Sequence, residues 1–267
     1  MHSSMFSVNC SIIFTEHEML RRPGVAYDAG FSSVEFWWPF STATPSDTEV
    51  NAFVQSISDA GVSLSALNFF AGDMSIGERG ILSSVRRAKE YEESLEILFY
   101  LAKATGCRIF NALYGNRSGG SREAEDAIAL ERLARLAPFT RDTGSVIVLE
   151  PISGFDAYPL TVARDALNII DRLQAVGATT NVKLLADVYH LAVNQDSVSN
   201  VIESYASQIG HVQIADAPGR NEPGTGHLPI FRWLEELAKV GYVGHVGLEY
   251  RPRSSSMDCF DWIPQVA

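Results

Sequence analysis

Short apolar segments that alternate with helical patterns are the feature of this sequence that most limits its fold. Most of these segments are apolar along nearly their whole length, which is typical of strands that helices cover on both faces of a parallel sheet. Eight segments rich in apolar or β-branched residues predict β-strands, at 6–10, 33–37, 63–68, 108–113, 146–151, 182–188, 211–215 and 245–250.

Helical patterns occupy the stretches between the predicted strands, and two of them are especially clear. The first places apolar residues at i+3 and i+4 spacing from Val85 to Ala102 and is followed by Gly106, a residue suited to the left-handed turn that ends a helix. The second runs from Ile230 to Ala238 and is followed by Gly241. Both patterns therefore predict helices that pack one apolar face against the sheet.

The alternation of strands and helices predicts a parallel sheet with right-handed crossovers, and eight such units are the number that closes into a barrel. The chain has 267 residues, which gives about 33 residues per unit, as a strand, a helix and two turns require. A doubly wound open sheet is the competing architecture. We disfavour it because no GxGxxG motif follows the first strand and polar residues end many strands. We therefore expect an α/β fold of the (β/α)8 TIM barrel type, as one domain over residues 1–267.

Composition excludes several classes of partner and site. The formal net charge of −11, with no stripe rich in Lys or Arg, disfavours nucleic acid. The sequence has no apolar run of membrane-spanning length and no secretory signal, so we expect no membrane partner and a cytoplasmic location. Cys10, Cys107 and Cys259 are scattered, which argues against a disulfide framework or a thiolate metal site. The sequence leaves open a homo-oligomer.

Polar side chains end four consecutive predicted strands, where a closed α/β barrel has its active site. They are Glu150 in VIVLEP, Asp187 in VKLLADVYH, Gln213 in HVQIAD and Glu249 in HVGLEY. A single one of these residues would more often be structural, with its hydrogen bonds satisfied, than functional. Three carboxylates that converge on one mouth repel one another unless a cation holds them. This oxygen-rich set predicts one divalent metal, Mg²⁺ or Mn²⁺, rather than zinc.

The positions of Glu150 and Glu249, on the fifth and eighth predicted strands, suggest a chemistry. They would approach the metal from different sides, with a substrate between them. Each carboxylate can bind the metal through one oxygen and move a proton with the other. A Lewis acid that polarises a carbonyl makes the neighbouring C–H more acidic. The arrangement therefore suits isomerisation of a hydroxy-carbonyl compound through an enediol.

Weaker signals surround this set. His190 is placed to hydrogen-bond a substrate oxygen, although a capping or supporting histidine is an equal reading. His211 has the same side-chain parity as Gln213 and fits a packing or supporting role. Any of Arg79, Arg220 and Arg251 is able to clamp a substrate carboxylate, although a solvated surface arginine is the commoner case. The candidate substrate-binding residues are therefore His190, Arg79, Arg220 and Glu222, the last in the loop 217–226.

The segments that carry these residues resemble those of a known family. The chain is similar to the hydroxypyruvate isomerases and the related 2-oxo-tetronate isomerases of the xylose-isomerase-like barrel superfamily. The similar segments are NFFAGDMSIGERGIL (68–82), LEPI (149–152), DVYH (187–190), GHVQIADAPGRNEPGTG (210–226) and GYVGHVGLEYRP (241–252). The segment 210–226 is the most specific, because many sibling families have a histidine at the position of Gln213.

The resemblance implies Mg²⁺ held by Glu150, Asp187, Gln213 and Glu249, with Glu150 and Glu249 as the proton donor and acceptor. It places His190 beside the substrate and implies conversion of hydroxypyruvate to tartronate semialdehyde. One departure is Leu67, where some relatives have a histidine.

The sequence is also compatible with other functions. A 2-oxo-tetronate isomerase and a keto-sugar 3-epimerase would use the same site. An endonuclease-IV-like phosphodiesterase needs several zinc ions, more histidines at strand ends and a basic groove, which this acidic chain lacks. A binding module for sugar acids would not need both glutamates.

Overall fold

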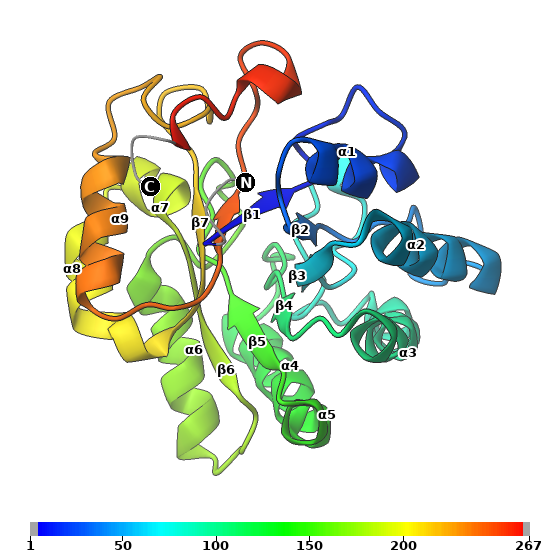
Figure 1. Cartoon of the computed structure of the whole chain (residues 1–267). Helices are drawn as coiled ribbons and strands as arrows, with labels where there is room; N and C mark the ends of the chain where they lie inside the picture. Colours follow the sequence, from blue (N-terminus) through cyan, green and yellow to red (C-terminus); the bar gives the residue numbers. More distant parts are fainter. Residues whose placement is uncertain (1–4, 264–267) are drawn as a thin grey trace.

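Eight parallel strands form the centre of the computed structural model, which describes residues 5–263 (Figure 1). They follow one another around a closed barrel in chain order. Their bounds are β1 Phe6–Asn9, β2 Ser33–Phe36, β3 Ser63–Asn68, β4 Ile109–Asn111, β5 Val146–Leu149, β6 Val182–Asp187, β7 Ile209–Ile214 and β8 Val246–Leu248. Pairing of β1 with β8 closes the sheet. The predicted (β/α)8 barrel is confirmed, and the open doubly wound sheet is excluded.

Helices surround the barrel and connect its strands (Figure 1). Their bounds are α1 Arg22–Asp28, α2 Asp47–Ala60, α3 Ala88–Thr105, α4 Arg122–Arg135, α5 Ala137–Thr143, α6 Ala163–Ala175, α7 Val188–Val193, α8 Val198–Tyr205 and α9 Ile230–Lys239. Among residues 5–263, no helix has both the length and the apolar character needed to cross a bilayer.

The two clearest helical patterns correspond to α3 and α9. Helix α3 ends at Gly106, whose φ of 76° is left-handed and whose N–H donates to the carbonyl of Ala102. Helix α9 buries Ile230, Trp233 and Leu237 on one face. A glycine therefore ends α3 where the sequence predicts it, because only glycine adopts this conformation without a steric penalty.

Strand register brings the polar strand ends together. Asp187 on β6 lies opposite Gln213 on β7, and Gln213 lies opposite Gly247 on β8. At the other side of the barrel, Asn68 on β3 lies opposite Asn111 on β4. The carboxyl ends of neighbouring strands thus present polar side chains at a common level, as parallel register requires.

A charged cluster on the outside of the barrel ties α4 to α6. The Asp126 carboxylate on α4 accepts hydrogen bonds from Tyr114 Oη at 2.6 Å, Arg117 Nη2 at 2.7 Å and Arg172 Nη1 at 2.8 Å. Burial raises the pKa of Asp126, but these hydrogen bonds outweigh it and hold the pKa below its usual value. The ionised carboxylate therefore stabilises the folded state.

We expect Asp126→Asn to lower the free energy of unfolding by about 2 kcal/mol at pH 6, because bonds to a charged group are lost. A depressed folded-state pKa stabilises above the unfolded value of about 3.9, and this stabilisation is lost as the pH falls through the folded value. Urea unfolding should show a smaller difference in the free energy of unfolding between the variant and the unaltered protein at pH 3 than at pH 6. Asp142→Asn, at an exposed pair with Arg141, is the control. An equal difference at both pH values would contradict the linkage.

Candidate active site

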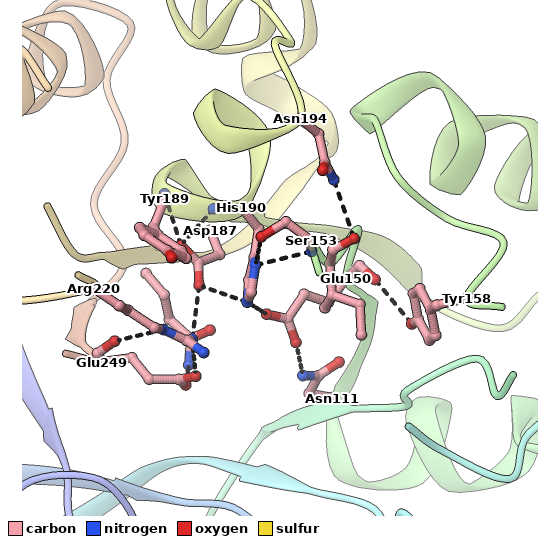
Figure 2. A network of polar contacts seen from close by, with 12 residues as sticks. Asn111, Glu150, Ser153, Tyr158, Asp187, Tyr189, His190, Asn194, Arg220 and Glu249 are labelled. Carbon is pink, nitrogen blue, oxygen red and sulfur yellow. Dashed lines mark hydrogen bonds and ion pairs between the residues drawn. The ribbon is translucent and has the colours of Figure 1, made fainter. Parts of the chain in front are cut away.

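A cavity of about 710 Å³ opens at the carboxyl ends of the strands. Glu150, His190, Arg220 and Glu249 line it together with side chains of the loops. Figure 2 shows that these four residues and Asp187 point toward one another. Asp187 ends β6, His190 lies on α7, and Glu150, Arg220 and Glu249 lie in the segments after β5, β7 and β8. The cavity is therefore where the predicted catalytic residues meet.

Glu150 follows β5 and is buried. Its Oε2 accepts a hydrogen bond from Asn111 Nδ2 at 2.6 Å, at the end of β4. Its backbone carbonyl accepts from Tyr158 Oη at 3.0 Å. Backbone and side chain are therefore both fixed, and Oε1 remains to face the cavity residue His190, whose Nε2 lies 3.9 Å away.

Asp187 ends β6 and also caps the N-terminus of α7. Its Oδ1 accepts from the backbone N–H of Tyr189 at 2.9 Å and of His190 at 3.4 Å. Its Oδ2 accepts from Arg220 Nη2 at 3.2 Å. The cap satisfies otherwise unpaired N–H groups of the helix and fixes the carboxylate, which leaves one oxygen for the site.

Glu249 follows β8, and its carboxylate accepts hydrogen bonds from three side chains. Its Oε2 accepts from Asn9 Nδ2 at 2.8 Å and from Gln213 Nε2 at 2.7 Å. Its Oε1 accepts from Arg220 Nη2 at 2.5 Å. Arg220 thus bridges Asp187 and Glu249, and the predicted residues Asp187, Gln213 and Glu249 form one continuous network.

The hydrogen bonds of His190 determine which ring nitrogen carries the proton. Its Nδ1 accepts from the backbone N–H of Ser153 at 3.0 Å. The ring proton is therefore on Nε2. Burial lowers the pKa of His190 to about 4, so the ring is neutral near pH 7. Nε2–H points at Asp187 Oδ2, 3.7 Å away, and can donate to an oxygen in the cavity.

The predicted substrate-binding arginines also lie at the cavity, but Glu222 does not. Arg79 and Arg251 line the cavity with Arg220. The Arg79 guanidinium lies over the Phe155 ring, 3.8 Å from its centre, and burial together with Arg220 lowers the pKa of Arg79. Glu222 lies outside the cavity lining, and its carboxylate accepts from the backbone N–H of Arg253 at 3.1 Å.

The loop that carries Arg220 is organised by one buried carboxylate. Asp216 accepts hydrogen bonds of 2.8–3.0 Å from the backbone N–H groups of Ala217, Gly224, Gly226 and Leu228. Arg220 itself has a φ of 56°, and its carbonyl accepts from the Arg251 N–H at 2.7 Å. That φ costs a non-glycine residue roughly 1–2 kcal/mol, so the surrounding bonds must hold it.

The carboxylates raise one another's affinity for protons. Burial, followed by the charges of Glu249 and Asp187, raises the pKa of Glu150 well above its usual value. Burial raises the pKa of Glu249 to about 7; Arg220 lowers it, and Asp187 and Glu35 raise it. One guanidinium does not compensate these charges fully. A further cation would favour the ionised forms.

The donor set fits a divalent metal. Glu150, Asp187 and His190 offer ligand atoms that all lie within 4.8 Å of one another. We discount His190 as a ligand because its Nε2 carries the proton. Gln213 Oε1 is buried and has no hydrogen-bond partner among residues 5–263, which leaves it free to bind a cation. Carboxylate and amide oxygens are the ligands that Mg²⁺ and Mn²⁺ prefer.

Sequence reasoning missed several supporting residues. Asn9 and Asn111 each donate to one of the two glutamates, and Ser153 orients His190. Glu35, buried on β2, accepts from both His211 and Gln213. The supporting role predicted for His211 agrees with this contact. A polar residue within or at the end of an apolar strand was the available signal for Asn9, Glu35 and Asn111.

Comparison with known proteins identifies the family of this chain. The family model described as xylose isomerase-like TIM barrel matches residues 24–265. The chain belongs to this family. A putative hydroxypyruvate isomerase of Streptomyces coelicolor is 43% identical, over 97% of this chain and 95% of that protein. The hydroxypyruvate isomerase of Escherichia coli is 31% identical over 97% of both chains.

A 2-oxo-tetronate isomerase of Cupriavidus necator, 30% identical over 97% of this chain and 96% of that protein, belongs to the same group of relatives. The family that the sequence motifs indicate is thereby confirmed. The chain is an isomerase of the xylose isomerase-like family.

Proposed function

We propose that this isomerase interconverts hydroxypyruvate and tartronate semialdehyde, with Glu150 and Glu249 as proton donor and acceptor. The observation that carries the proposal is the convergence of Glu150, Asp187 and Glu249 on one buried site beside Gln213. The side-chain oxygen of Gln213 has no hydrogen-bond partner among the described residues 5–263. The names of the relatives support the substrate class. Glu150, Asp187, Gln213 and Glu249 would hold one Mg²⁺ or Mn²⁺ ion.

The metal, when bound, acts as a Lewis acid that makes the C–H beside a carbonyl more acidic. One glutamate removes a proton from C3 of hydroxypyruvate, and the electron pair of that C–H bond forms the C2–C3 double bond. The C2 oxygen takes up a proton, which gives an enediol. The O3–H proton then leaves as the C3 aldehyde forms, and the second glutamate delivers a proton to C2. Exchange with solvent returns both glutamates to their starting protonation states.

Other residues of the chain position this exchange. Asn9 and Asn111 each hold one oxygen of a catalytic glutamate, so the carboxylates cannot rotate freely. His190 Nε2–H can donate to the oxygen that gains negative charge, because the neutral ring keeps its proton. Orientation of this kind lowers the barrier through the reduced cost of arranging the reacting groups.

A 2-oxo-tetronate is the second candidate substrate. A relative of nearly equal length bears this activity in its name, and the cavity of about 710 Å³ has room for a four-carbon acid as well as for a three-carbon one. Purified protein with Mg²⁺ or Mn²⁺ should be assayed with hydroxypyruvate, 2-oxo-tetronates and free ketoses. Carbonyl migration in an acid supports an isomerase, whereas inversion of a ketose stereocentre alone would establish the 3-epimerase alternative.

Arg220 is our first choice for contact with the substrate carboxylate. Loss of the bridge from Arg220 to Asp187 and Glu249 affects both substrates, but only an acid also loses a charge-assisted bond. We therefore expect Arg220→Ala to raise KM for an acid by about 10- to 100-fold more than KM for a neutral ketose. Steady-state kinetics on both substrates measure the difference. Arg253→Ala, which is exposed and outside the cavity lining, is the control. Equal effects on both substrates would remove Arg220 from this role.

A further inference from the structure

A buried carboxylate inside the barrel bonds to Gln213, one of the proposed metal ligands. Glu35 comes from β2, and both its oxygens are engaged. Oε1 lies 2.8 Å from His211 Nε2, and Oε2 accepts from Gln213 Nε2 at 3.0 Å. His211 and Gln213 are neighbours on the same face of β7. An ionised carboxylate only accepts hydrogen bonds, so His211 donates through Nε2–H.

This contact determines which way the Gln213 amide faces. Gln213 Nε2 donates to Glu35 and also to Glu249 Oε2, 2.7 Å away. With both carboxylates ionised, as a bound cation would favour, the reversed amide would place its oxygen against two oxygens that cannot donate. Only one orientation is therefore compatible with the network. In that orientation Oε1 is buried and has no hydrogen-bond partner within the part of the chain that the structure describes.

The backbone of β8 is shaped around the same carboxylate. A Cβ atom at Gly247 would lie 2.6 Å from both oxygens of Glu35 and 2.8 Å from Gln213 Cγ. Those distances are shorter than van der Waals contact, so any other residue at Gly247 would displace Glu35 or Gln213. Three strands thus contribute to one arrangement: β2 supplies the carboxylate, β7 the amide and β8 the space.

We propose that Glu35, held by His211, is a positioning residue that fixes the Gln213 amide with its oxygen toward the divalent metal. The inference rests on the proposed function, because it requires that a metal binds at Gln213. Glu35 acts through Gln213 and does not itself touch the substrate. The role depends on Glu35 as a hydrogen-bond acceptor rather than on its negative charge.

Two substitutions at Glu35 separate the acceptor from the charge. Glu35→Gln keeps an oxygen for Gln213, and its own N–H can donate to His211 in the other ring tautomer. Glu35→Leu keeps a comparable volume but removes the acceptor. Supporting residues of metal ligands commonly change affinity by about 10- to 100-fold. We therefore expect Kd for Mn²⁺ to rise at least about tenfold in Glu35→Leu and less than about threefold in Glu35→Gln.

The measurement is titration of the metal-free full chain with Mn²⁺ alone, followed by electron paramagnetic resonance of the free ion. Gly247→Ala provides an independent test if Glu35→Leu fails to fold. We expect it to weaken Mn²⁺ binding, because the new methyl displaces Glu35 and Gln213. Gly210→Ala is the matched control on β7, since its Cβ would meet Val148 and Lys183 side chains at 2.8 Å instead. The thermal midpoint of each metal-free variant reports its folding.

The outcomes divide clearly. Weak Mn²⁺ binding in Glu35→Leu, or in Gly247→Ala where Glu35→Leu does not fold, supports the inference if Glu35→Gln and Gly210→Ala bind nearly as the unaltered protein does. Equal losses in both Glu35 variants would show that charge matters instead, and unchanged binding in Glu35→Leu and Gly247→Ala would reduce Glu35 to a packing role. Either result overturns the inference but leaves the proposed function standing. Failure of the unaltered protein to bind Mn²⁺ would overturn both.

Discussion

Glu150→Gln and Glu249→Gln should each lose at least about 10²- to 10⁴-fold in kcat with hydroxypyruvate, because general acid–base catalysis is worth that much. The loss should exceed this range where the substitution also damages the metal site. A glutamine retains an oxygen that can accept the hydrogen bond from Asn111 or Asn9. The variants should therefore fold normally, and the loss should report proton transfer rather than unfolding.

Deuterium exchange distinguishes the two glutamates. Only the variant that lacks the base for the first step should also stop exchange of the C3 protons of hydroxypyruvate with D₂O, as followed by proton NMR. Glu203→Gln, exposed on α8, should leave both exchange and turnover unchanged. Near-normal kcat in either Glu150→Gln or Glu249→Gln would remove that residue from the proton-transfer pair.

Removal of divalent metal should abolish turnover, with a loss of at least about 10²-fold, because the carboxylates alone cannot polarise the carbonyl. Chelation followed by dialysis gives the metal-free protein, and addition of Mg²⁺ or Mn²⁺ should restore the rate. Turnover under carefully chelated conditions at the original rate would show that the chemistry proceeds without the ion.

Ligand substitutions test the same site. Asp187→Asn should weaken Mn²⁺ binding more than Gln213→Ala, since it removes a formal charge and not a neutral dipole. Asparagine caps a helix about as well as aspartate, so α7 should remain intact. Asp171→Asn, exposed on α6, controls for the change in net charge. A larger effect of Gln213→Ala would contradict this ranking.

The barrel was predictable because strands and helices differ in the spacing of their apolar residues, and the two spacings alternate along the sequence. The ends of the strands were harder to predict. The predicted strand 108–113 extends only over Ile109–Asn111 as β4. Ala112, Leu113 and Tyr114 continue as buried loop, where Ala112 N–H still bonds to the Val148 carbonyl. Burial gives a loop and a strand the same apolar composition, so periodicity cannot distinguish them.

The candidate site was predictable where chemistry coincided with a strand end. Glu150 and Glu249 follow buried strands, Asp187 ends one, and Gln213 is the last residue but one of β7; the cavity lies at that level. Glu35 could not be assigned in the same way. It lies inside an apolar strand, and its partner His211 is 176 residues away in sequence. Such contacts depend on how the strands tilt and face one another across the closed barrel, which a local pattern does not contain.

The dependence of the Arg220 loop on Asp216 has a consequence for protein engineering. Four backbone N–H groups share that carboxylate, and bonds to a charged group contribute roughly 1.5–3 kcal/mol each. An insertion or a transplanted sequence in this loop would disrupt several of them together. Arg79 is instead anchored by carbonyls of its own segment, those of Met74 and Glu78. Directed evolution toward new acids should therefore vary the residues around Arg79 and leave the Arg220 loop intact.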